Sequence, residues 1–123
     1  MRKLTKKQIE RLALEIRRFL LNRDMWVDVT IYFNGKAIST DDRNGNFGYN
    51  DPDKLFILEN MNPRDYFLYA GDILSMSFEG DFYDVLNYDC WPAAKKHFED
   101  LLSKYGLYYE LGNSWNLTVA MKG

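Results

Sequence analysis

The chain has a single cysteine and a single histidine among 123 residues. Cys90 therefore has no partner for an intramolecular disulfide, and Cys90 and His97 together cannot supply the three or four side chains of a zinc site. This use of cysteine fits a reducing compartment. We expect neither a metal centre nor a cofactor.

Long apolar runs are also missing. No stretch approaches the roughly 18 consecutive apolar residues of a membrane span, and the N-terminus leads directly into a charged helical segment instead of the apolar core of a signal peptide. These features predict a cytoplasmic protein that does not insert into a membrane.

Signatures of catalysis are scarce. No glycine-rich phosphate loop follows a strand. Cys90 and His97 would lie about 10 Å apart along a helix axis at ~1.5 Å per residue, beyond hydrogen-bond reach. Cys90 is interpreted as a small buried apolar residue, and the sequence as a whole argues against an enzyme.

The composition is that of a folded chain, with 46% hydrophobic and 28% charged residues. The length predicts one domain over residues 1–123. The aromatic share of 16% is high for a domain of this size, so some rings should reach the surface, where such side chains often anchor partners.

The net charge of −2 conceals a segregation of charge along the chain. Residues 1–25 carry a net charge of +5, residues 26–90 carry −8, and residues 91–123 carry +1. Such asymmetry is typical of an electrostatic binding face, but it also fits a basic helix that packs beside acidic loops.

The N-terminal half predicts a helix followed by a hairpin. Thr5 and Gln8 form a capping-box pair, and apolar residues then recur at helical spacing from Ile9 to Leu20. Alternating residues from 27 to 33 lead into Asn34-Gly35, the strongest short hairpin signal, which places Ile31 opposite Ile38 and Tyr32 opposite Ala37. Residues 41–53 read as a long polar loop.

The C-terminal half predicts two helices, one strand, a second hairpin and one ambiguous stretch, residues 81–87. Residues 62–71 read as a helix of about two turns, and residues 73–78 as a central strand. A second helix is expected from Asp89 as its cap to Gly106, with Trp91 and Phe98 on its buried side. A second hairpin is expected with a three-residue loop at residues 112–114, which places Trp115 on the same face as Leu111 and Leu117.

The expected fold is therefore α+β, with a mainly antiparallel sheet of about five strands, two main helices and one short helix. The order along the chain is α-β-β-α-β-α-β-β, with the helices packed on one face of the sheet.

Three groups of residues are candidates for a site. A basic surface of the first helix would bind a partner through five side chains, namely Lys7, Arg11, Leu14, Arg18 and Leu21. An acidic patch would comprise Glu79, Asp81 and Asp84. The loop residues Asp42, Asn44, Asn46, Asn50 and Asp53 match the spacing of a calcium loop. However, Phe47 replaces the glycine that such a loop requires, so we interpret the segment as Asx-rich turns.

The stretch from Leu74 to Asn87, LSMSFEGDFYDVLN, resembles segments of uncharacterised small bacterial proteins of a kind associated with mobile elements. The resemblance covers barely a tenth of the chain. It implies a bacterial protein and no particular activity.

The leading hypothesis is a non-enzymatic accessory module that binds a protein partner, because aromatic residues are in surplus and no catalytic site is evident. One alternative is a small enzyme that uses the acids near residues 79–84. Another is nucleic-acid binding through the basic first helix, which the sequence pI of about 5.4 opposes. We also expect a homodimer formed through Leu14, Leu21 or an exposed edge strand of either hairpin.

Overall fold

The computed structural model describes residues 3–68, 70–88 and 90–123. Within them it has an α+β fold with three α-helices and one six-stranded antiparallel sheet in the order β3-β2-β1-β4-β6-β5. The helices are α1 (Lys6–Leu21), α2 (Asp81–Asn87) and α3 (Pro92–Lys104). The strands are β1 (Val29–Phe33), β2 (Lys36–Ser39), β3 (Phe56–Glu59), β4 (Leu74–Phe78), β5 (Leu107–Asn113) and β6 (Asn116–Met121).

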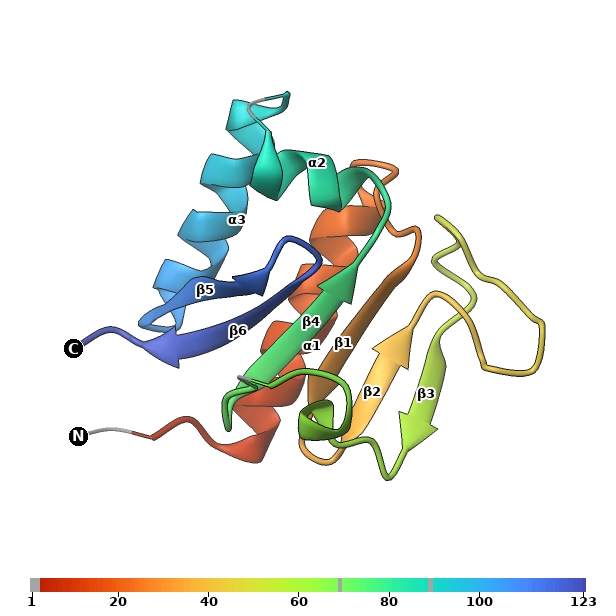
Figure 1. The fold of residues 1–123 in the computed structure, drawn as a ribbon, viewed down its shortest axis with the longest axis horizontal. Coiled ribbons are helices and arrows are strands. Elements are labelled where there is room, and N and C mark those ends of the chain that lie inside the picture. The colour runs from red at the N-terminus through yellow and green to blue at the C-terminus, as the bar shows by residue number, and fades with distance from the viewer. Residues whose placement is uncertain (1–2, 69, 89) are drawn as a thin grey trace.

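Helix α1 begins as the sequence predicts. The Thr5 hydroxyl accepts a hydrogen bond from the Gln8 backbone N–H at 3.1 Å, and the Gln8 side chain accepts one from the Thr5 N–H at 2.8 Å. The apolar side of α1 is buried from Ile9 to Leu20, and the opposite side is exposed. Because that apolar side packs on the sheet, α1 covers one sheet face (Figure 1).

The first hairpin has the predicted register, with Ile31 opposite Ile38 and Tyr32 opposite Ala37. Its turn uses Asn34 and Gly35, both at positive φ, which is the backbone a two-residue hairpin turn requires. Strand β1 then pairs with β4 on its other side. Both neighbours are therefore antiparallel to β1.

Two predictions about the segment between β2 and β4 are wrong in part. Residues 56–59 form strand β3, which pairs with β2 and gives the sheet six strands instead of about five. A four-residue strand is too short for its own alternation to specify it, so its pairing with β2 decides its conformation. Within the described residues of the range 62–71, the structure has the 3₁₀ turn Pro63–Asp65, capped by the Asn62 side chain, in place of a two-turn α-helix.

The ambiguous stretch after β4 is helix α2. Its first turn carries Asp81 and Asp84, and its inner side buries Phe82, Val85 and Leu86. Gly80 precedes it at a point where a Cβ atom would lie 2.5 Å from the Val27 carbonyl oxygen. A side chain larger than that of glycine would therefore require the backbone to move.

The start of α3 also differs from the prediction. Trp91 is the N-cap residue, and the predicted cap, Asp89, lies outside the described residues. Trp91 is 41% exposed instead of buried. The predicted burial of Phe98 is confirmed, and Ala94 and Leu102 are buried on the same side of the helix.

The second hairpin has a different register from the predicted one. Its turn lies between Asn113 and Asn116, and the ladder shifts by one residue between Leu111 and Asn113. This bulge contains Gly112, where an added Cβ atom would clash with Asn116 Oδ1. Leu111 consequently pairs with Leu117, whereas Trp115 lies in the turn and contacts Phe67 on the other side of the sheet.

The main core lies between the sheet and the pair α1 and α3. Phe98 of α3 is at its centre, with its ring centroid 5.0 Å from that of Phe82 and 5.9 Å from that of Phe19. The opposite sheet face carries no α-helix of the described chain and is crossed only by the segment containing the 3₁₀ turn (Figure 1). None of the described helices is long and apolar enough to span a bilayer.

Candidate functional site

The sheet face opposite α1 and α3, called the open face below, has a floor of hydroxyl groups. Alternation along β1 and β4 directs Thr30 and Ser75 to this face while their neighbours enter the main core. Thr30 Oγ1 lies 3.0 Å from Ser39 Oγ, and Ser75 Oγ donates to Thr118 Oγ1 at 3.2 Å. These hydroxyls satisfy one another and are structural.

An aromatic row crosses the open face above that floor. It consists of Tyr66, Tyr32, Phe67 and Trp115. Neighbouring ring centroids in the row are 5.6, 5.3 and 5.8 Å apart, in that order. Tyr32 and Phe67 are buried and form the base of the row. Burial raises the pKa of the Tyr32 hydroxyl above its usual range.

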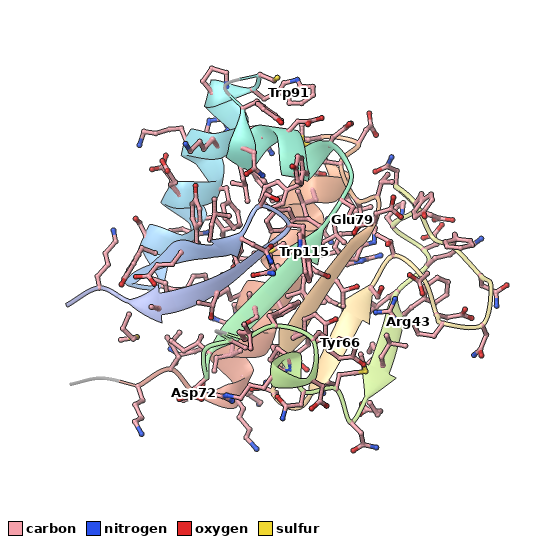
Figure 2. The ribbon with its side chains drawn as sticks, viewed as in Figure 1. Arg43, Tyr66, Asp72, Glu79, Trp91 and Trp115 are labelled. Carbon is pink, nitrogen blue, oxygen red and sulfur yellow. The ribbon has the colours of Figure 1, made fainter. Side chains whose placement is uncertain are left out.

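The two ends of the row and the residue after Phe67 reach solvent. Tyr66 is 53% exposed, Leu68 is 91% exposed and Trp115 is 36% exposed. Figure 2 shows Tyr66 and Trp115 at different points around the open face, together with Arg43 and Glu79. Rigid rings that are supported from below and exposed above are typical of the anchors of protein interfaces.

A small polar pocket of about 210 Å³ lies beside Trp115. Its lining includes three carboxylates and one guanidinium group. The lining residues are Asp28, Thr30, Thr40, Asp41, Arg43, Ser77, Phe78, Glu79 and Trp115. The pocket therefore joins an aromatic wall to an acidic rim.

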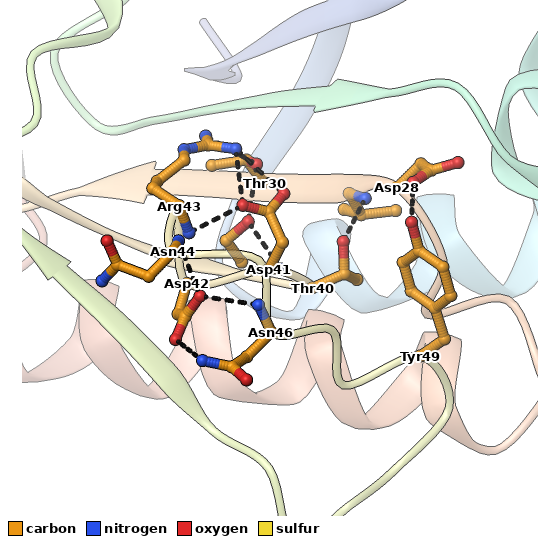
Figure 3. A network of polar contacts seen from close by, with 11 residues as sticks. Asp28, Thr30, Thr40, Asp41, Asp42, Arg43, Asn44, Asn46 and Tyr49 are labelled. Carbon is orange, nitrogen blue, oxygen red and sulfur yellow. Dashed lines mark hydrogen bonds and ion pairs between the residues drawn. The ribbon is translucent and has the colours of Figure 1, made fainter.

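The polar groups of this rim are tied together through the loop between β2 and β3 (Figure 3). Arg43 Nη1 donates to the two carboxylate oxygens of Asp41 at 3.2 and 3.0 Å, and Arg43 Nη2 lies 3.5 Å from Thr30 Oγ1. Tyr49 donates its hydroxyl hydrogen to Asp28 at 2.5 Å. That hydrogen bond, followed by desolvation, raises the pKa of Tyr49 to about 12.

Glu79 completes the rim at the end of β4, and it is exposed. No cation of the described chain lies within 4.0 Å of its carboxylate, in contrast to Asp41, which Arg43 neutralises. The pocket thus carries more negative than positive charge. A basic group of a partner would be attracted to it.

Four of the five residues predicted to form the basic surface of α1 lie together on the structure. Lys7, Arg11, Leu14 and Arg18 are exposed and line a shallow groove of about 440 Å³. Leu21 instead packs against the main core. Acidic residues interrupt the surface, since Glu10 and Glu15 line the same groove and pair with Lys36 and Lys104.

The predicted acidic patch is divided. Glu79 lines the polar pocket, whereas Asp81 and Asp84 belong to the first turn of α2 and lie outside that pocket. Carboxylates at a helix start have a structural role, because they interact favourably with the helix dipole. The three acids therefore do not converge on one cavity.

The structure also places the remaining candidates. Cys90 is exposed, so its interpretation as a buried residue is wrong. Nδ1 of the exposed His97 accepts from Arg23 Nη2 at 2.5 Å. The Asp42 carboxylate accepts from the N–H groups of Asn44 and Asn46 and from the Asn46 side chain, which is the predicted Asx-turn geometry. No cluster of three potential metal ligands occurs within the described ranges.

The aromatic row and the polar pocket were not predicted as a site. The surplus of aromatic residues was the only signal, and it did not identify which rings would be exposed. The sequence predicts Tyr66 and Phe67 within a helix that does not form, and it predicts Trp115 on the wrong face of the sheet.

In comparisons with protein-family models, curated proteins and solved structures, none matches this chain.

Proposed function

We propose that this protein is a non-enzymatic binding module that recognises a protein partner through the open face of its sheet. The observation that carries the proposal is the exposure of Tyr66 and Trp115 at the ends of the aromatic row and of Leu68, the residue that follows Phe67. Interfaces concentrate their binding energy in a few such apolar anchors. The other sheet face is occupied by α1 and α3, so it is not available to a partner.

The polar pocket defines the chemistry that the partner should present. Asp28 and Glu79 give it a negative rim, and the side chain of Trp115 lines the pocket beside them. A lysine or arginine side chain complements both features, through charge attraction and cation–π contact. A partner segment with an apolar residue next to a basic one fits the open face.

The proposal is tested by affinity purification from the native host with three forms of the chain. The test variant is Leu68→Asp, which changes a side chain that is 91% exposed and therefore does not disturb the core. The matched control is Leu14→Asp, which changes an exposed leucine on the basic surface of α1. We expect specific partners to be captured by the wild type and by Leu14→Asp, and to be lost with Leu68→Asp.

The isolated partner then gives a quantitative measurement. Loss of an anchor residue should weaken binding at least about tenfold in titration calorimetry. The affinity of the wild type should also fall as salt is raised, because the acidic rim is exposed to solvent. Capture that is insensitive to Leu68→Asp but abolished by Leu14→Asp would transfer the function to α1 and refute the proposal.

The two alternative functions have less support. A carboxylate-based enzyme needs its acid and base in one cavity, and only Glu79 of its three candidates lines the polar pocket. Nucleic-acid binding through α1 needs an uninterrupted positive surface, and Glu10 and Glu15 divide it. The absence of a gel shift at low salt would end the nucleic-acid hypothesis.

A further inference from the structure

The two edges of the sheet are formed by β3, with four residues, and β5, with seven. The edge strand of a sheet presents unpaired N–H and C=O groups that can pair with another chain. Strand β5 pairs with β6 on one side and with no other strand of the described chain. Its pairing is regular from Leu107 to Leu111, before the bulge at Gly112.

We propose that β5 pairs with β5 of a second copy of this chain, antiparallel and with Tyr109 on the two-fold axis. Antiparallel pairing of an edge strand with its own copy requires a two-fold axis perpendicular to the sheet. Such an axis keeps the corresponding faces of the two copies on the same side of the joined sheet. Residues that lie opposite one another must then belong to the same face. With Tyr109 on the axis, Tyr108 lies opposite Glu110, and Leu107 lies opposite Leu111.

The polar side chains of β5 select this register. The Tyr108 hydroxyl donates to Glu110 Oε1 at 2.9 Å within one chain, so the phenol and the carboxylate are already matched as donor and acceptor. The proposed pairing sets each Glu110 carboxylate beside the partner's Tyr108 as well. An axis at Glu110 would place two carboxylates opposite each other, which is destabilising.

The apolar side chains favour the same register. A groove of about 460 Å³ lies between α3 and β5, and Leu102, Leu107 and Leu111 contribute to its lining. Leu111 is 41% exposed at one end of the groove. In the proposed pair, Leu111 of each copy reaches the other copy's groove beside Leu107. The projecting side chain and the groove occupy one patch, as a self-complementary interface requires.

This inference does not depend on the proposed function, because β5 lies at the sheet edge and the aromatic row lies on the open face. The two proposals are nevertheless compatible. Since the axis is perpendicular to the sheet, the open faces of the two copies point to the same side. A dimeric partner could then engage both of them.

The first test is sedimentation velocity over a wide range of protein concentration. The test variant is Leu111→Asp, and the matched control is Ile57→Asp, which changes an exposed residue on the opposite edge strand, β3. We expect a dimer for the wild type and for Ile57→Asp, and a complete loss of the dimer for Leu111→Asp. A wild type that stays monomeric, or a dimer that survives Leu111→Asp, overturns the proposal.

The second test examines the register by disulfide formation in a Cys90→Ser background. One chain carries Tyr108→Cys and another carries Glu110→Cys, both at exposed positions. Residues opposite each other in neighbouring strands have Cβ atoms about 4.5–5.5 Å apart, close enough for a disulfide after small adjustment. Oxidised glutathione accepts the two electrons and is released as two thiols.

We expect a covalent dimer when the two cysteine chains are mixed, and much less when either is oxidised alone. Circular dichroism of the reduced chains confirms that they are folded. Equal crosslinking of the mixture and of the separate chains, or no crosslinking in any sample, overturns the proposed register and with it the proposal. Neither outcome bears on partner capture through Leu68.

Discussion

The guanidinium group of Arg17 lies over the indole ring of Trp26, with 5.8 Å between Cζ and the ring centroid. Arg17 Nη2 also lies 3.4, 3.2 and 3.3 Å from the carbonyl oxygens of Asp51, Pro52 and Lys54, respectively. One buried cation on α1 thus holds the end of the loop between β2 and β3. The same loop carries the Asp41 and Arg43 side chains of the polar pocket.

Replacement of Arg17 should therefore destabilise the protein. We expect Arg17→Met to lower the free energy of unfolding by about 1–3 kcal/mol, because the carbonyl groups lose a charged donor. Urea denaturation followed by circular dichroism measures the change. Arg18→Met, an exposed neighbour on the same helix, should have almost no effect. Equal losses for the two variants would contradict the structural role of Arg17.

Stability should depend on pH through Tyr105. Burial and the hydrogen bond to Glu15 at 2.6 Å raise the pKa of Tyr105 to about 12, against about 10 in the unfolded chain. The folded state therefore holds its proton more tightly, and this contribution to stability is fully present below about pH 10 and lost as the pH rises through about 12.

The variant Tyr105→Phe isolates this contribution. Tyr49 also has its pKa raised to about 12, mainly by its hydrogen bond to Asp28, so the wild type should lose stability for two reasons. Urea midpoints measured across the alkaline range should decline less steeply for Tyr105→Phe than for the wild type. Identical slopes would show that Tyr105 does not titrate with the raised pKa.

Truncation of two aromatic residues of the α3 region should destabilise the protein to very different extents. Phe98 is fully buried, so Phe98→Ala should cost about 3–5 kcal/mol. Trp91 is 41% exposed, so Trp91→Ala should cost well under 1 kcal/mol. Guanidinium denaturation of both variants measures the difference. A large loss of stability for Trp91→Ala would instead support the buried position that helical spacing predicts for Trp91.

Much of the fold could be predicted from local signals. The capping box at Thr5 and Gln8 and the turn at Asn34 and Gly35 specify their backbone within a few residues, and both are confirmed. The candidate site was harder to predict from the sequence than the fold. Of the predicted site residues, Glu79 alone lies in the polar pocket, and Leu21 packs into the core instead of meeting a partner.

The incorrect predictions share one physical cause, because contacts between residues distant in sequence determine the local structure of these segments. Strand β3 is defined by its pairing with β2, and the predicted helix near residue 65 is reduced to one 3₁₀ turn. Phe67 of this segment packs on Tyr32 and Trp115, which both lie far from it in the sequence. The bulge at Gly112 then reverses the side on which Trp115 lies.

Local sequence patterns specify the α+β class, the main helices, the inward faces of β1 and β4 and the turn of the first hairpin. These features follow from hydrophobic period and from backbone preferences that act over a few residues. Which rings are exposed and which acids lie together depends on tertiary packing, because the exposure of a side chain is set by the segments that pack over it. Such packing joins segments whose positions in the chain carry no local signal of one another.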